Sequence, residues 1–155
     1  MYDIILSSLT RQDKALAVLF DLLEEEYTHL MHRDTDSIAA NEFSIQELIR
    51  QLVSEKHIVI KALGGIRASQ YAETLPEEQA RPLLDLLASI DNNEQNTSRN
   101  ASRNAQLSLA LLDQSTRNLN KFTEHAVPKT SFVYGRRGAM RTVAHSEASL
   151  LSGRL

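Results

Sequence analysis

Apolar residues recur every seven positions in the first third of the chain. Each of two series holds four aliphatic residues: Leu9, Leu16, Leu23 and Leu30, then Ile38, Ile45, Leu52 and Val59. A period of seven places such side chains in one stripe along a helix. The sequence therefore predicts two long helices, each with one apolar face.

Short polar and glycine-containing segments bound these two helices. Residues 33–36 separate the series, and Thr35 or Asp36 is predicted to cap the second helix through its side-chain oxygen. A connection this short makes the helices antiparallel neighbours. Gly64 and Gly65 are predicted to end the second helix.

A connector at 66–82 precedes a third long helix. Pro76 suits the first position of a helix, and Pro82 predicts a break or kink after Arg81. Residues 83–126 contain no Gly or Pro and are apolar at both ends. The polar stretch 91–104 between those ends is rich in Asn, a weak helix former, so it is either a loop or helix. The absence of Gly and Pro favours one continuous helix.

The helical pattern ends at Val127-Pro128. We therefore predict an all-α fold: a long antiparallel helical hairpin plus a third long helix, forming an elongated helical bundle. Residues 1–127 are predicted to form this bundle domain. Residues 128–155 are predicted to be a largely irregular tail.

Charge is distributed unevenly between these two parts. The tail holds five basic residues and one acidic residue, so its net charge is +4. Because the whole chain has a net charge of −3, residues 1–127 have a net charge of −7. A basic tail on an acidic body suits nucleic acid, a membrane surface or an acidic protein surface. The N-terminus lacks the pattern of a signal peptide, and no apolar run is long enough to span a membrane. With no Cys in the chain, a cytoplasmic location is expected.

Residues that carry chemistry are sparse. His29 and His32 share a helix face, but two ligands do not make a metal site. Glu24, Glu25 and Glu26 are typical of a solvated helix face rather than of acid catalysis. Phosphate-binding and nucleophile motifs are missing. We expect no enzyme activity, no cofactor and no metal.

Two apolar segments are candidates for protein binding. The first is a leucine-bearing face near the end of the third helix: Leu107, Leu111, Leu112, Leu119 and Phe122. It either packs inside the bundle or accepts an amphipathic helix of a partner. The second is Phe132-Val133-Tyr134 in the tail, which either packs back on the body or serves as a linear docking motif.

Several of these features together resemble the FlgN family of flagellar export chaperones. They are the helical hairpin, Glu55-Lys56 in the second helix, the Asn-containing stretch, the leucine-bearing helix and a tail with the pattern Phe-x-Tyr-Gly-x-x-Gly. Residues 132–138 are the most specific part. Arg136 and Arg137 between the glycines depart from the family pattern, as does the length of the Asn/Ser/Arg stretch.

The resemblance implies a cytoplasmic chaperone for the hook–filament junction proteins FlgK and FlgL. It implies that the leucine-bearing face binds the C-terminal helices of those substrates. Docking to an export gate protein similar to FlhA is implied for Tyr134, with Phe132 and Gly135 beside it. No nucleic acid and no stable membrane insertion are expected.

Two other functions remain open from the residues alone. A coiled-coil adaptor or structural homo-oligomer would associate through the same leucine face. A nucleic-acid-binding protein would use the basic tail, although the acidic body argues against it.

Overall fold

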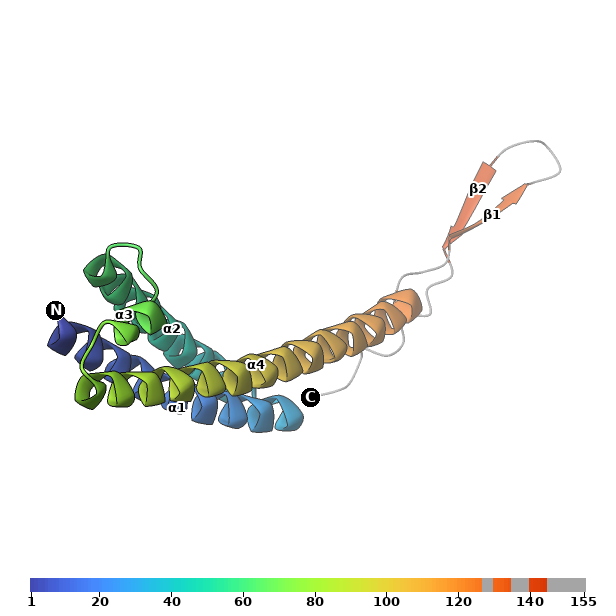
Figure 1. Ribbon diagram of the computed structural model, residues 1–155. Helices are drawn as coiled ribbons and strands as arrows, with labels where there is room; N and C mark the ends of the chain where they lie inside the picture. Colours follow the sequence, from blue (N-terminus) through green and yellow to red (C-terminus); the bar gives the residue numbers. More distant parts are fainter. Residues whose placement is uncertain (127–129, 135–139, 145–155) are drawn as a thin grey trace. The chain divides into compact units, whose positions relative to one another are not determined.

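The computed structural model describes residues 1–126, 130–134 and 140–144, with side chains for residues 1–124. Its elements, in chain order, are α1 (Tyr2–His32), α2 (Thr35–Leu63), α3 (Ala68–Glu73), α4 (Glu77–Ala126), β1 (Thr130–Tyr134) and β2 (Met140–Ala144) (Figure 1). The chain divides into two compact units, residues 1–108 and 109–155. The all-α class, with a long hairpin and a third long helix, is confirmed. The predicted boundary between residues 127 and 128 stays a prediction.

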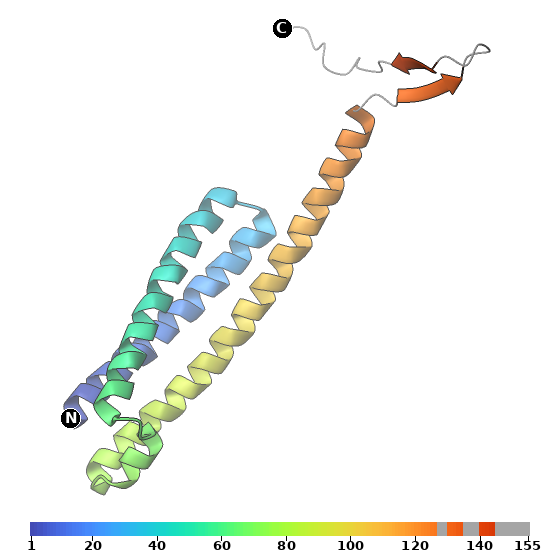
Figure 2. The same ribbon diagram turned by 90° about the horizontal axis from the view of Figure 1, so that it is seen from above.

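Helices α1 and α2 form the predicted hairpin and lie side by side (Figure 2). Arg33 ends α1 in the left-handed conformation, with φ at 56°. Asp34 then caps α2, because its carboxylate accepts hydrogen bonds from the Ser37 backbone N–H at 3.2 Å and from the Ser37 hydroxyl at 2.7 Å. The cap therefore lies one residue before Thr35 and two before Asp36, the two residues predicted to supply it. The same two bonds lower the pKa of Asp34.

The heptad leucines of α1 are the centre of the core. Leu9, Leu16, Leu23 and Leu30 are each 4–5 % exposed. From α2, Ile45 and Val59 are buried, whereas Leu52 and Ile38 are half-buried. At roughly 25 cal/mol per Å² of apolar surface, this burial is the main stabilising contribution to the hairpin.

Helix α2 ends where the sequence predicts it. Gly64 adopts φ of +60° and Gly65 of +93°, a region that side chains with a Cβ rarely adopt. The short α3 follows and contributes Ala72 to the core, beside Leu83 and Ile90 of α4. Helix α4 begins directly after Pro76.

The break predicted at Pro82 is wrong, because α4 continues through it. Proline lacks an N–H, so it removes the hydrogen bond that residue 82 would donate to the carbonyl of Glu78. That loss falls within the second turn of a helix of 50 residues. Leu83, the next residue, is completely buried, and its packing holds this turn in helical geometry.

The tail contains two short strands that the sequence analysis did not predict. Strands β1 and β2 pair antiparallel, with Phe132 opposite Thr142 and Tyr134 opposite Met140. Both segments are rich in β-branched and aromatic residues, the composition typical of strands. The other tail residues lie outside the described part of the chain.

Candidate protein-binding surface

Helix α4 changes character along its length. Positions seven apart, starting at Leu83, face the interior of the first unit: Leu83, Ile90, Thr97 and Asn104 are each at most 7 % exposed. The series begins with aliphatic residues and continues with polar ones. The polar stretch 91–104 is helical and lies against α1, where carboxylates accept hydrogen bonds from Asn93, Asn100 and Asn104. The buried Thr97 hydroxyl has no partner among the described side chains.

The last part of this interface is a network of amide and carboxylate groups. Asn104 donates from Nδ2 to the Leu23 carbonyl at 2.7 Å and to Glu26 Oε2 at 2.8 Å. Asn100 and Arg103 donate to Glu24 Oε1 at 2.6 and 3.0 Å. These bonds satisfy polar groups that burial would otherwise penalise.

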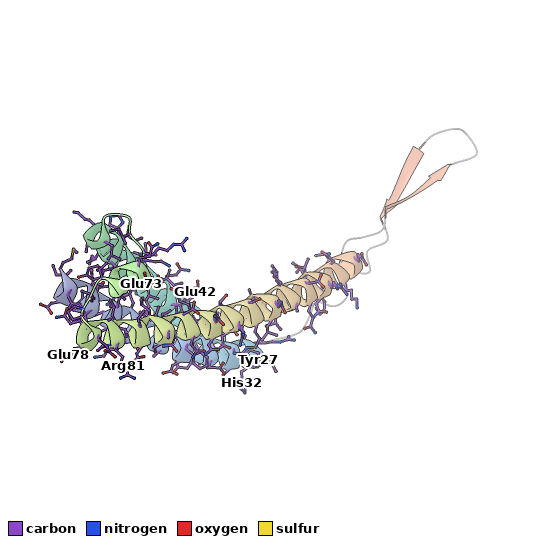
Figure 3. All side chains as sticks on the ribbon, viewed as in Figure 1. Tyr27, His32, Glu42, Glu73, Glu78 and Arg81 are labelled. Carbon is purple, nitrogen blue, oxygen red and sulfur yellow. The ribbon has the colours of Figure 1, made fainter. Side chains whose placement is uncertain are left out.

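Two further contacts extend the polar interface in both directions along α1. Near the start of α4, Ser89 and Asn93 donate to Asp13 Oδ1 at 2.8 and 2.9 Å. Tyr27, which Figure 3 labels, lies near the end of α1, and the guanidinium of Arg103 of α4 lies 4.0 Å from the centroid of its ring. A cation over an aromatic face is attracted by the ring's electrons. Helix α1 therefore shares an apolar cluster with the start of α4, which contributes Leu83 and Ile90, and contacts the following part of α4, up to Asn104, largely through polar side chains.

Beyond Leu111, the described side chains of α4 are no longer covered. Every residue from 112 to 124 is exposed. Four large apolar side chains lie on one side of this helical segment and are more than three-fifths exposed: Leu109, Leu112, Leu119 and Phe122. We call these four residues the exposed row. Apolar surface of this kind marks an interaction site.

The residues predicted to bind substrate fall into two groups. Leu107 and Leu111 are half-buried. Leu112, Leu119 and Phe122 are 63 %, 62 % and 75 % exposed and belong to the exposed row. The sequence analysis missed Leu109, which is 67 % exposed. Its position three residues before Leu112, on the same side of the helix, was the pattern that could have identified it.

The residues predicted to dock on the export gate are only partly described. Phe132 and Tyr134 lie in β1. Gly135 lies outside the described residues. Their docking role stays a prediction.

The charges of the second half of α4 are balanced. Residues 109–126 hold Asp113 and Glu124 against Arg117 and Lys121. Arg117 pairs with Asp113 at 2.8 Å within the helix. Because the segment has no net charge, its attraction for a partner depends on apolar contact.

An ion pair with two hydrogen bonds lies elsewhere, between α1 and α2. Arg11 donates to both carboxylate oxygens of Glu55, at 2.6 and 2.9 Å, and the Ser8 hydroxyl donates to the second oxygen at 2.7 Å. The Arg11 and Ser8 hydrogen bonds hold the pKa of Glu55 below its ordinary value. Glu55 is thus a structural anion that ties the hairpin together.

The histidines considered as metal ligands lie at the end of α1. Figure 3 labels His32, whose Nδ1 lies 2.7 Å from the Thr28 carbonyl oxygen. Within the described residues, no three side chains of the metal-ligating types come together. Nor does any described helix combine the length and apolarity that crossing a membrane requires.

The fold and surface define a class: an all-helical protein whose longest helix ends in uncovered apolar side chains. Residues 1–142 of the chain match the protein family that is described as FlgN protein. The chain therefore belongs to the FlgN family, whose members are flagellar export chaperones rather than enzymes. Neither a curated protein nor a solved structure matches the chain.

Proposed function

We propose that this protein is a cytoplasmic chaperone of flagellar type III export. Its clients are the hook–filament junction proteins, similar to FlgK and FlgL, whose C-terminal helices it binds. It keeps them unassembled and delivers them to an export gate protein similar to FlhA. Membership of the FlgN family supports the chaperone role in general, and the specific clients are part of the proposal.

The observation that carries the proposal is the exposed row on α4. A client whose terminal helices pair only on assembly presents apolar stripes before that event. Leu112 and Leu119 are seven residues apart, the spacing at which helices pack against each other. We propose that the binding face comprises the predicted set, Leu107, Leu111, Leu112, Leu119 and Phe122, together with the exposed Leu109.

Sedimentation of the full-length protein, alone and with a client's C-terminal helices, tests this proposal. A chaperone forms a defined complex with the client segment at micromolar concentration. The alternative, a structural oligomer unrelated to export, instead self-associates tightly through the same face and leaves the client segment free. The second result would replace the proposal.

We also propose a division of labour between residues 1–127 and the tail. The first part holds the client, and the tail, through Phe132, Tyr134 and Gly135, delivers it. A chain truncated after Val127 should keep its client affinity and its helical circular dichroism. Secretion of the client should fall when this truncated chain replaces the full-length one. Loss of client affinity by a folded truncated chain would contradict the division.

A further inference from the structure

Apolar burial holds only the start of α4 against the hairpin. One apolar cluster joins Leu83 and Ile90 of α4 to residues of α1, α2 and α3. The second cluster, formed around Leu19, Leu23 and Ile45, contains residues of α1 and α2 alone. The core between these two helices therefore does not require the part of α4 beyond Ile90.

The sixteen residues after Ile90 add no buried apolar side chain. We call residues 91–106 the polar span. Its only apolar side chains are Ala101 and Ala105, which are both exposed, and the next one, Leu107, is half-buried. The Cα atoms of α1 also lie closer to those of α2 than to those of α4. Separation of the span from α1 therefore exposes little apolar surface of α4.

Most contacts that hold the polar span are polar and lie partly in water. Arg103 and its partner Glu24 are 39 % and 45 % exposed. Glu94, whose partner is Lys56 of α2 at 3.8 Å, is more exposed still. Pairs this exposed contribute little to stability. The buried Asn104, with its two hydrogen bonds, is the main attachment of the span.

Thr97, in the middle of the polar span, opposes this attachment. It is buried, and among the described residues its Oγ1 has no hydrogen-bond partner. A buried hydroxyl without a partner raises the free energy of the folded state. Water satisfies that hydroxyl once the span separates from α1, so separation removes the penalty.

The polar span also has little helical stability of its own. Five of its sixteen residues are Asn, which is among the weaker helix formers. Most of the stability of a helix in a protein comes from packing rather than from propensity. The span therefore unfolds when it separates, and its backbone N–H groups then exchange with solvent.

We propose that the polar span detaches from α1 and unfolds as one segment while the hairpin and the start of α4 stay folded. Helix α4 then has an anchored start, up to Ile90, and a releasable middle. Such local opening requires less free energy than global unfolding. This conformational device lies within residues 1–108 and does not depend on the proposed function.

Amide hydrogen exchange of the full-length protein, followed by NMR, tests the proposal. The amides of 95–106 bond to carbonyls that also lie in the span. Their protection factors should share one value, at least about tenfold lower than those of 83–90 and of the buried residues of α1. Equal protection across 83–106 would overturn the proposal. A gradual fall of protection from 83 to 106 would also overturn it, because it indicates fraying rather than release of one segment.

A variant in the hairpin core separates local opening from global unfolding. Ile45→Val, in the cluster without α4, should lower the protection factors of the buried residues of α1 about two- to tenfold. It should leave those of 95–106 unchanged, because the hairpin stays folded when the span opens. An equal fall in both sets would show that the span exchanges only by global unfolding, contrary to the proposal.

A matched pair of threonines tests why the span opens. Thr97→Val keeps the side-chain shape and removes the unsatisfied hydroxyl, so protection of 95–106 should rise about fivefold or more. Thr116→Val should leave it unchanged, because Thr116 is exposed and its hydroxyl already donates to the Leu112 carbonyl. Unchanged or lower protection in Thr97→Val would overturn this account of the opening.

Discussion

Two regions of this molecule share the same apolar periodicity and differ in what covers it. The heptad leucines of α1 are at most 5 % exposed, whereas Leu112 and Leu119 of α4, also seven apart, are more than 60 % exposed. The spacing predicts which side of a helix is apolar. The spacing does not show whether another helix of the same chain covers that side. The uncovered stripe is therefore the one available to a partner.

A second contrast lies within the first unit. Helix α1 packs on α2 and on the start of α4 through aliphatic residues. It also contacts α4 through Asp13, Glu24 and Glu26 and their amide partners. Aliphatic contacts stabilise without direction, whereas each hydrogen bond fixes one position of α4 along α1. The apolar interface thus provides most of the stability, and the polar interface determines the register.

The largest expected effect separates the covered stripe from the uncovered one. Leu16→Ala should reduce the free energy of unfolding by about 2–5 kcal/mol, because it leaves a cavity in the core. Leu119→Ala should change it by less than about 0.5 kcal/mol, because Leu119 is exposed. Urea denaturation followed by circular dichroism measures both. Similar losses for the two variants would mean that α4 is covered at its end.

The polar interface has the next largest expected effect. Asn104→Leu should reduce the free energy of unfolding by about 1–3 kcal/mol, since Glu26 and the Leu23 carbonyl lose a buried partner. Asn118 lies fourteen residues later on α4, at the equivalent heptad position, and is exposed. Asn118→Leu should therefore have almost no effect. A stabilising Asn104→Leu would show that the network serves something other than folding.

The smallest expected effect is the pH dependence of the α1–α2 contact. The pKa of Glu55 is lowered in the folded protein, so its contribution is complete above the unfolded value of about 4.5 and is lost as the pH falls through the folded value. Glu55→Gln should melt about 2–4 °C lower than the parent chain at pH 7. The difference should shrink steadily below pH 4.5.

Calorimetry across pH 3–7 measures this dependence. Glu47→Gln is the control, because Glu47 and its partner Arg50 are both more than 60 % exposed, and such pairs contribute little. A difference between Glu55→Gln and the parent that stays constant to pH 3 would contradict the lowered pKa.

Local chemistry made most of the helical fold predictable. Heptad leucines, the glycine pair after Leu63 and the run without Gly or Pro from 83 to 126 each specify structure over a few residues. Pro82 misled the prediction because its local cost is outweighed by the buried Leu83, a tertiary contact that the sequence pattern does not contain. The helix cap lies at Asp34 rather than at Thr35 or Asp36, because several neighbouring side chains can supply the oxygen.

The candidate surface was only partly predictable. The apolar positions from Leu107 to Phe122 follow from spacing alone. The change from half-buried to exposed after Leu111 does not, because spacing shows which side of a helix is apolar and not whether another segment covers that side. The strands at 130–134 and 140–144 were missed for a different reason: their β-branched residues were judged against helical periodicity, which they lack.

The affinity of the full-length protein for the C-terminal helices of a hook–filament junction protein tests the central claim most directly. Calorimetric titration should show Leu119→Asp binding at least about 30-fold more weakly than the parent chain, as expected for a charge introduced into an apolar interface. Ala110→Asp, which adds the same charge about 200° around the helix from Leu112, should bind as the parent does. Equal affinities for all three proteins, with helicity retained, would contradict the claim that the exposed row of α4 holds the client.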